Sequence, residues 1–236
     1  MGLLQVYFDL VYNPIYDFTT GRMSCYRKLQ GLAVSRLELN DEERILCVGL
    51  GTGNEICHIL EANKNVNIVG VDYSKAVLEK ARTKALKLGK EITLAFMDAR
   101  KLEFADGSFD KVLCFHVLDF VTDGWAVTNE ILRVLKSGGR FAVTYPSDSE
   151  GPSMGYKLMK DVALDYLNSD KNRLLAVLEM TVHLITNMVY VPLLFRKQKG
   201  AYSRAEIENK LASMDCKNVQ IEKDDIYQDF IVCGAK

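Results

Sequence analysis

Three closely spaced glycines and one aspartate are the residues most suited to chemistry in this chain. Gly49, Gly51 and Gly53 follow a short apolar run, and a helical pattern of apolar residues begins at Glu55. Such a strand, turn and helix lets the backbone approach a ligand closely. Asp72 ends the next apolar run, where a carboxylate can accept hydrogen bonds from both hydroxyls of a ribose. The pattern predicts a site for a nucleotide-like ligand.

The spacing within the turn distinguishes two classes of ligand, dinucleotides and S-adenosylmethionine. The dinucleotide fingerprint requires its third glycine at position 54, where this chain has Asn54. Glu55 falls in the first helical turn, where a carboxylate repels a pyrophosphate but tolerates an ammonium and a sulfonium. A turn that only shapes the fold is the alternative, and the matching acidic residue Asp72 argues against it.

Beyond Asp72, apolar runs and helical patterns alternate as in an α/β fold. Ser203 and Glu206 form a capping box for a helix that extends to about Ser213. Two closing strands predict a terminal antiparallel hairpin, which a dinucleotide fold usually lacks. The predicted elements are strands at 91–97, 111–115, 140–145, 219–222 and 229–233, and a helix at 125–135 that Gly138 and Gly139 terminate.

Four segments between Ile45 and Val143 follow one another in a recognisable order. They are VGLGTG, VGVDYS, FMDARKLEFADGSFDKVLCFHVLDFV and LKSGGRFAV. In this order they resemble the motifs of class I S-adenosylmethionine-dependent methyltransferases. The resemblance implies a three-layer, Rossmann-like α/β fold with a seven-stranded sheet and a terminal antiparallel hairpin. It also implies that S-adenosylmethionine is the cofactor.

The resemblance assigns a role to each residue of the expected cofactor site. The glycines allow backbone approach, Asp72 takes the ribose hydroxyls, and Tyr73 covers the adenine face. The adenine edge is read by one carboxylate and one neighbouring amide, and two residues after the fourth strand line the methionine side. The expected residues are Gly49, Gly51, Gly53, Asp72, Tyr73, Asp98, Ala99, Phe115 and His116.

The amino-terminal arm, residues 1–40, adds a resemblance to a subgroup. Tyr12 to Lys28 (YNPIYDFTTGRMSCYRK) is similar to the corresponding segment of ubiquinone and menaquinone C-methyltransferases and of bacterial phosphatidylethanolamine N-methyltransferases. In that type of enzyme the arm closes over the methionine end of the cofactor. Tyr16 and Arg22 are the expected contributors, Arg22 as a partner for the cofactor carboxylate. The alternative is that the aromatic residues only pack the arm on the core.

Methyl transfer from a sulfonium requires mainly that the acceptor is aligned and water excluded, so no metal is expected. Positioning alone can supply about 7 to 11 kcal/mol of the barrier. A base is needed only if the acceptor is a hydroxyl, a carbon acid or a protonated amine. His116, after the fourth strand, and His183 are the candidate bases. For His116 the alternative is that it shapes the cofactor pocket.

Residues 147–201 form a long helical insertion before the last helix, and they predict a lid that sets substrate choice. Within it, Leu174 to Phe195 is mostly apolar, but Glu179, His183 and Asn187 recur every fourth residue on one helical face. Three alternatives stay open: a core helix with its polar stripe in water, a lid lining a pocket for a hydrophobic acceptor, and a helix on a membrane surface. The last would use 174–199, including Arg196, Lys197 and Lys199.

Composition predicts one domain, residues 1–236. The chain has 48% hydrophobic residues and no repeat, and its net charge of -1 gives no basic field for nucleic acid. Its six cysteines lack CxxC spacing and suggest reduced thiols, and no signal peptide pattern is present, so a cytoplasmic protein is expected. The sequence leaves the oligomeric state open.

The sequence therefore predicts methyl transfer to a small, hydrophobic or lipid-like acceptor. Two alternatives remain. One is a methyltransferase for a polar small metabolite. The other is a protein without transfer activity that binds S-adenosylmethionine or S-adenosylhomocysteine as a sensor or subunit.

Overall fold

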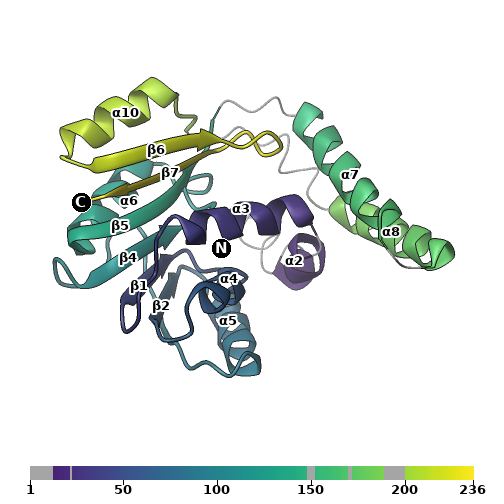
Figure 1. The fold of residues 1–236 in the computed structure, drawn as a ribbon, viewed down its shortest axis with the longest axis horizontal. Coiled ribbons are helices and arrows are strands. Elements are labelled where there is room, and N and C mark those ends of the chain that lie inside the picture. Colours follow the sequence, from purple (N-terminus) through teal and green to yellow (C-terminus); the bar gives the residue numbers. More distant parts are fainter. Residues whose placement is uncertain (1–12, 22, 148–151, 170–171, 189–199) are drawn as a thin grey trace. The chain divides into compact units, whose positions relative to one another are not determined.

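A computed structural model of the chain describes residues 13–21, 23–147, 152–169, 172–188 and 200–236. Its contacts divide the chain into two compact units, which are described separately (Figure 1). The sheet unit comprises Gln30–Asp148, Gln198–Asp224 and Asp229–Lys236. The helical unit comprises Met1–Leu29, Ser149–Lys197 and Asp225–Gln228.

One seven-stranded sheet forms the centre of the sheet unit. Its strand order is β3-β2-β1-β4-β5-β7-β6, and β7 runs antiparallel to both of its neighbours. This arrangement confirms the predicted fold class and terminal hairpin. Because β1 pairs with β2 on one side and β4 on the other, the strand order reverses at β1, where α/β sheets bind ligands. The strands are β1 Arg44–Val48, β2 Asn67–Asp72, β3 Thr93–Phe96, β4 Phe109–Cys114, β5 Leu135–Tyr145, β6 Lys217–Lys223 and β7 Phe230–Ala235.

Helices cover both faces of this sheet and make it the middle of three layers (Figure 1). Alternate residues of β1 point to opposite faces. Leu46 and Val48 join one buried cluster with Ile131 of α6 and Ile207 of α10. Glu55 of α4 lies on the other face, near Cys47. The helices of these two outer layers are α4 Glu55–Ala62, α5 Lys75–Lys87, α6 Gly124–Val134 and α10 Arg204–Ser213.

Strand β5 begins five residues earlier than predicted and contains the two glycines that were expected to precede it. The predicted break at Gly138 and Gly139 is wrong because Lys236 pairs with them. The Gly138 amide donates to the Lys236 carbonyl at 2.8 Å, and the Lys236 amide donates to Gly139 at 3.0 Å. Gly138 has a φ of 75° and lies where the register with β4 shifts. The glycines therefore form a bulge within the strand.

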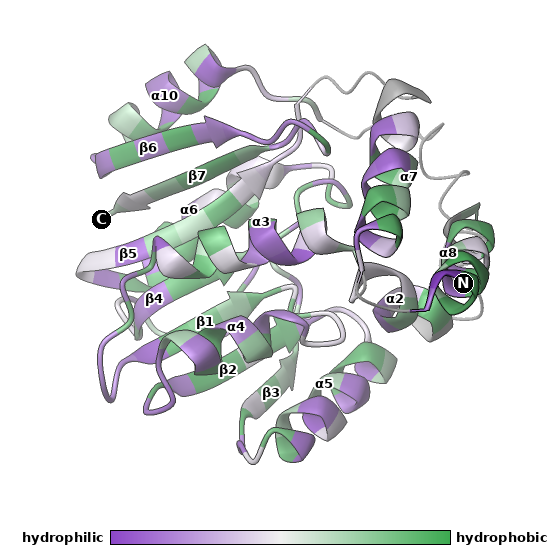
Figure 2. Cartoon of the chain, turned by 45° about the vertical axis from the view of Figure 1, so that its right-hand side comes forward, coloured by the Kyte–Doolittle hydropathy of each residue, from purple (hydrophilic) through white to green (hydrophobic). Residues whose placement is uncertain are grey.

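The helical unit contains α2 Asn13–Thr20, the start of α3 Ser24–Ser35, α7 Pro152–Leu167 and α8 Arg173–Asn187. Figure 2 shows α8 as mostly hydrophobic. The predicted helix was to reach Phe195, but residues 189–199, with Arg196, Lys197 and Lys199, lie outside the described residues. Among the described helices, none combines the length and the apolar character needed to cross a membrane.

His183 of α8 is fully buried, so the idea of a polar stripe in water is wrong for this residue. Its ring nitrogen Nε2 lies 3.0 Å from the carbonyl oxygen of Thr19 in α2. The rings of Phe18 and Tyr166 pack edge-on against it. The imidazole therefore makes a buried polar contact between α8 and α2.

Candidate functional site

The turn between β1 and α4 is held by backbone conformations that favour glycine. Gly49, Gly51 and Gly53 have φ values of 66°, 56° and 77°. A Cβ atom at Gly49 would lie 2.2 Å from Cγ2 of Val117, whereas one at Gly51 would have no neighbour nearer than 4.0 Å. The turn therefore needs glycine at position 49 for both its conformation and its packing.

Asp72, at the end of β2, braces this turn. Its Oδ2 accepts a hydrogen bond from the Gly51 amide at 2.9 Å, and its Oδ1 accepts one from the Ser74 amide at 2.9 Å. Burial raises the pKa of Asp72, and the amide bonds oppose that rise. The Tyr73 amide also donates to this carboxylate, which has about four acceptor sites, so Asp72 keeps acceptor capacity for a ligand hydroxyl beside the glycine turn.

Glu55 is buried at the start of α4. Its Oε1 accepts a hydrogen bond from the Gln30 side chain at 3.2 Å, and its Oε2 is shielded from solvent with no hydrogen-bond partner among the described residues. Burial raises the pKa of Glu55 to about 7. The sequence-based interpretation of a fully charged carboxylate is therefore corrected, because this group is about half protonated near neutral pH.

Beyond β2 and β3, the side chains expected at the adenine are more exposed. Tyr73 is 68% exposed and stacks on Phe96, with ring centroids 5.0 Å apart. Asp98 accepts hydrogen bonds from the Arg100 guanidinium at 2.6 to 3.2 Å, and this contact lowers the pKa of Asp98. Ala99 packs partly buried against the main core cluster. Sequence reasoning missed Phe96, although an exposed aromatic residue at the end of a strand is a detectable signal.

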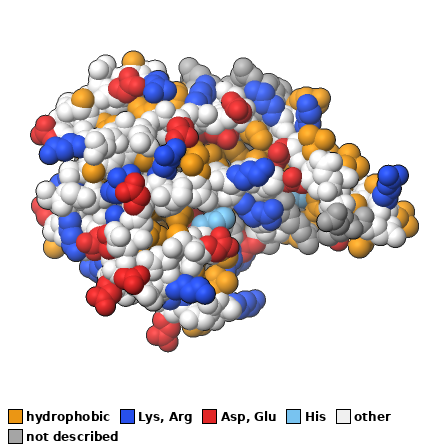
Figure 3. Space-filling model, viewed as in Figure 1, with side chains coloured by type: hydrophobic (Ala, Val, Ile, Leu, Met, Phe, Trp, Pro, Cys, Tyr) orange, Lys and Arg blue, Asp and Glu red, His pale blue; other side chains and the backbone are white. Residues whose placement is uncertain are grey.

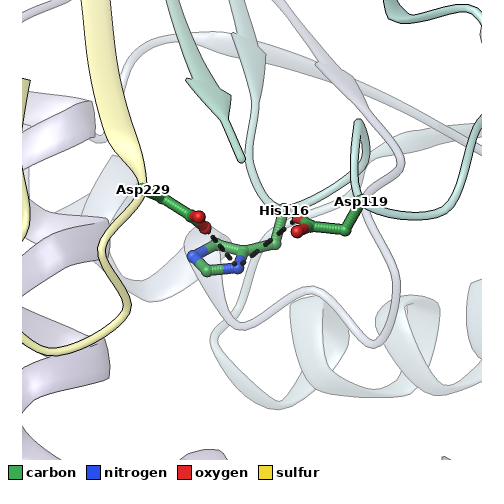
Figure 4. Close-up of side chains that lie close together, drawn as sticks. All are labelled: His116, Asp119 and Asp229. Atoms are coloured by element: carbon green, nitrogen blue, oxygen red, sulfur yellow. Dashed lines mark ion pairs between the residues drawn. The ribbon is translucent and has the colours of Figure 1, made fainter. Parts of the chain in front are cut away.

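A second group of polar side chains lies beyond the end of β4 (Figure 4). The His116 amide donates to Thr144 Oγ1 at 2.6 Å, and His116 has a φ of 53°. Its ring Nδ1 lies 3.5 Å from Oδ2 of Asp229 and 3.9 Å from Oδ2 of Asp119. Phe115, one residue earlier, is buried. The structure thus surrounds one imidazole nitrogen with two carboxylates.

The protonation of this group is governed by burial. Burial lowers the pKa of His116, and the charge of Asp119 opposes that change. Burial raises the pKa of Asp229 well above its ordinary value, and Asp119 raises it further. Sequence reasoning missed Asp229 because it lies 113 positions after His116 and reaches it only through the position of β7 in the sheet.

The remaining predicted site residues belong to the helical unit. Tyr16 shares a hydrogen bond between hydroxyls with Tyr26. His183 is buried against Thr19, as described above. Arg22 lies outside the described residues. The structure therefore brings the glycines and Asp72 together in the sheet unit and places Tyr16 and His183 in the other unit; the roles of these residues stay predictions.

Comparisons with known proteins agree with this geometry. The family model described as a methyltransferase domain matches residues 46–143. The chain is 32% identical over 145 residues to a ubiquinone/menaquinone biosynthesis C-methyltransferase of Geotalea uraniireducens, covering 59% of this chain and 61% of that protein. It is 32% identical over 131 residues to a phosphatidylethanolamine N-methyltransferase of Cereibacter sphaeroides, covering 55% and 62%. The matches thus span about three fifths of these relatives.

Solved structures share the fold over nearly the whole chain. A putative S-adenosylmethionine-dependent methyltransferase of Methanococcus maripaludis aligns with a TM-score of 0.62 at 16% identity, covering 95% of this chain and 90% of that one. A methyltransferase of Aquifex aeolicus aligns with a TM-score of 0.57 at 14% identity, covering 99% and 98%. At these identities the likeness concerns the fold. Residues 46–143 thus match a methyltransferase domain, within a chain that shares its fold with solved S-adenosylmethionine-dependent methyltransferases.

Proposed function

We propose that this protein transfers a methyl group from S-adenosylmethionine to a small, hydrophobic or lipid-like acceptor. The observation that carries the proposal is the glycine turn braced by Asp72 within a methyltransferase domain. The turn offers backbone without side chains, and Asp72 offers remaining acceptor capacity beside it. A ribose with two hydroxyls fits this pair of features.

The other cofactor roles follow from the position of each side chain. The exposed ring of Tyr73, supported by Phe96, covers the adenine, and Asp98 with the Ala99 amide reads its edge. Phe115 and His116 line the methionine side, and Tyr16 and Arg22 are retained as contributors from the arm. The cofactor supplies an electrophilic methyl group on a sulfonium. The protein aligns the acceptor with that methyl and excludes water.

If the acceptor must lose a proton, His116 is the better placed of the two histidines. It follows β4, next to the strand at which the sheet order reverses, whereas the ring of His183 is buried against a backbone carbonyl. An imidazole with a lowered pKa is neutral near pH 7 and can accept a proton. The role of His183 as a base stays a prediction.

The hydrophobic nature of the acceptor is supported by the relatives and by the insertion. Related proteins carry names for methylation in ubiquinone/menaquinone biosynthesis, of phosphatidylethanolamine and of 27-O-demethylrifamycin SV. Leu174, Leu178 and Ile185 of α8 are 80%, 61% and 61% exposed. We propose that the insertion 147–201 and the arm 1–40 belong to one functional domain with the sheet and select the acceptor, with contact to a membrane surface through 174–199 as the alternative use.

The charge distribution does not favour nucleic acid as a partner. The net charge is -1, and lysine and arginine side chains intermingle with acidic ones over the sheet unit on the face drawn in Figure 3. All six cysteines are free thiols, as predicted. They support, together with the sequence pattern, the proposed cytoplasmic location.

Calorimetric titration with S-adenosylmethionine and S-adenosylhomocysteine tests the first step. Binding of either ligand is expected, and Asp72→Ala should weaken it by about 10-fold to 150-fold, since hydrogen bonds to a charged group contribute about 1.5 to 3 kcal/mol. Asp72→Asn is the control, because it keeps one acceptor oxygen for the turn. It shows whether the loss of cofactor affinity in Asp72→Ala comes from a disturbed fold. Absence of binding to both ligands by the folded protein would refute the proposal.

Transfer itself needs a second experiment. Incubation with methyl-labelled cofactor and a cell extract should give a labelled product that partitions into organic solvent. Labelled product in the aqueous phase would favour the polar-metabolite alternative. Cofactor binding without any labelled product would favour the sensor or subunit.

A further inference from the structure

We propose that His116, Asp119 and Asp229 bind a divalent metal ion. Each residue offers one ligand atom, and the three atoms lie within 4.8 Å of one another. Figure 4 shows the imidazole between the two carboxylates, with Asp119 on the loop after β4 and Asp229 immediately before β7. One nitrogen and two oxygens from two separate segments of the chain thus converge on one point.

The distances in this group suit a coordination sphere better than direct hydrogen bonds. Nδ1 of His116 is 3.5 Å from Asp229 Oδ2 and 3.9 Å from Asp119 Oδ2. Hydrogen bonds between nitrogen and oxygen are about 2.7 to 3.2 Å long. Ligand atoms that lie about 2.0 to 2.2 Å from a tetrahedral ion are about 3.3 to 3.6 Å apart. All three ligand atoms lie within 4.8 Å of one another, so closing the group around an ion requires movements of no more than about 1 Å.

A second observation concerns charge. Oδ2 of Asp119, the oxygen nearest to His116, is shielded from solvent and has no hydrogen-bond partner in the described part of the chain. The Asp229 side chain is only 5% exposed. Within the described ranges, neither carboxylate forms an ion pair with a lysine or arginine. The Asp119 side chain is 20% exposed, so one buried and one partly buried carboxylate lie side by side and repel each other unless a proton or a cation balances them.

The backbone around the group is fixed by contacts outside it. Thr144 of β5 accepts a hydrogen bond from the His116 amide, and the Ser147 amide donates one to the Asp229 carboxylate. The Asp229 carbonyl accepts from the Asp224 amide at 2.9 Å. Partners of this kind orient ligands before a metal arrives. The donors therefore stay converged without an ion to hold them.

The donor set indicates which ions fit. Imidazole suits zinc and other transition metals, and carboxylates suit manganese and magnesium as well. One histidine with two aspartates therefore favours Mn²⁺, Zn²⁺ or Fe²⁺ and leaves coordination positions for other oxygens. This set departs from the sequence-based expectation that no metal is needed.

The role of the ion rests on the proposed function. An acceptor hydroxyl bound to the ion would lose its proton to water more readily than a free hydroxyl. Its oxygen would then form a bond to the methyl carbon while the carbon–sulfur bond breaks and leaves its electron pair on sulfur. In this arrangement His116 would act as a ligand, the ion would act as a Lewis acid that lowers the pKa of the acceptor hydroxyl, and water would take the proton.

Manganese binding to the intact, chelator-treated protein tests the inference. Mn²⁺ is chosen because thiols of the six cysteines compete for zinc. We expect one ion per chain by calorimetry and by loss of the free Mn²⁺ signal in electron paramagnetic resonance. His116→Gln and Asp229→Asn should each weaken binding at least 10-fold, and Asp119→Asn provides a third variant if one of these fails to fold.

His58→Gln is the matched control. His58 also lies in the sheet unit next to an acidic residue, with Nδ1 3.5 Å from Glu61, but outside the proposed site. This variant should bind Mn²⁺ as the natural sequence does. Absence of Mn²⁺ binding by the folded protein, or binding that survives both His116→Gln and Asp229→Asn, would overturn the inference.

Cofactor titrations in parallel separate this inference from the proposed function. S-adenosylmethionine binding without Mn²⁺ binding would overturn the metal site and leave the proposed function standing. Mn²⁺ binding that depends on His116, in a protein that binds neither S-adenosylmethionine nor S-adenosylhomocysteine, would support the site and refute the proposed function.

Discussion

The glycine turn after β1 and the histidine group after β4 lie in the same unit, but their polar atoms differ in how they are satisfied. In the turn, the amides of Gly51 and Ser74 donate to Asp72, each at 2.9 Å. In the histidine group, Nδ1 of His116 is 3.5 and 3.9 Å from its carboxylates, and Asp119 Oδ2 has no hydrogen-bond partner among the described residues. The turn is complete without a ligand, whereas the histidine group is not.

The two regions also differ in how they are assembled. The turn and Asp72 come from one short βαβ segment, and their contacts are set by local backbone geometry. The histidine group requires β7 to be placed beside β5, which brings Asp229 to His116 across 113 positions of sequence. The glycine turn, whose contacts are local, suits a cofactor that many enzymes share. The histidine group, which is assembled across the sheet, can differ between enzymes that act on different acceptors.

The largest effect is expected where the turn itself is broken. Gly49→Ala combines a positive φ of 66° with a Cβ placed 2.2 Å from Val117. Conformational strain of about 1 to 2 kcal/mol adds to overpacking of about 1 to 3 kcal/mol, so the free energy of unfolding should fall by about 2 to 5 kcal/mol. Urea denaturation measures this change.

Gly51→Ala is the matched control for that prediction. Gly51 has a similar φ of 56°, but a Cβ there meets no atom closer than 4.0 Å. Only the strain of about 1 to 2 kcal/mol should remain. Equal losses in the two variants would mean that the contact with Val117 does not constrain the turn.

Glu55→Gln should remove one source of pH dependence from the free energy of unfolding. Burial raises the pKa of Glu55 from 4.5 to about 7. Between these values the unfolded chain loses the proton and the folded chain keeps it, so stability falls as pH rises from 4.5 to 7 and then levels off. The total is about 3 kcal/mol. We would measure the free energy of unfolding of both proteins at pH 5, 6, 7 and 8. The difference between the variant and the natural protein should shift in favour of the variant as pH rises from 5 to 7, and then stay constant.

The difference between the two proteins isolates this residue, because the other titrating groups are shared. Glutamine also keeps an oxygen for the Gln30 side chain, which donates to Glu55 at 3.2 Å. If the free energies of unfolding of the two proteins changed in parallel from pH 5 to 8, the raised pKa of Glu55 would be contradicted.

The features that depend on neighbouring residues, such as the glycine turn, could be predicted from the sequence. Apolar runs, the glycine spacing and the position of Asp72 predicted the strand, turn and helix, since each depends on neighbours within a few residues. The helix at Arg204–Ser213 and its cap at Ser203 were confirmed for the same reason, with Ser203 accepting from the Glu206 amide at 3.2 Å.

The features that depend on contacts between distant parts of the chain could not be predicted in this way. The start of β5 was misplaced because its glycines pair with Lys236, almost one hundred positions later. His183 was expected on a polar stripe, but it is buried against Thr19 of a distant helix. Asp229 reaches His116 only through the sheet topology. In each case the decisive partner lies far away in the sequence, where periodicity carries no information.

Thr144→Val tests the scaffold of the histidine group. Thr144 is 1% exposed, and its hydroxyl accepts from the His116 amide at 2.6 Å. Valine removes the acceptor, and an unsatisfied buried amide costs about 1 to 3 kcal/mol of unfolding free energy. Mn²⁺ affinity should fall as well, because the His116 backbone loses this contact. Thr144→Ser, which keeps the hydroxyl, should restore both readouts, and a valine variant with unchanged stability would contradict the scaffold role.

Arg100→Gln should have the smallest effect and sharpens the comparison on the adenine side. The guanidinium of Arg100 holds the pKa of Asp98 below its ordinary value, but Arg100 is exposed and Asp98 partly exposed to solvent, where ion pairs contribute little to stability. The melting temperature at pH 7 should therefore not change measurably. The pKa of Asp98, followed by nuclear magnetic resonance of its carboxyl carbon, should rise toward its ordinary value. Because a depressed carboxyl pKa stabilises the fold only above that pKa, any difference between the two proteins should vanish at low pH. A large loss of stability at pH 7 would show that this edge, like the glycine turn, depends on its side-chain contacts to keep its shape.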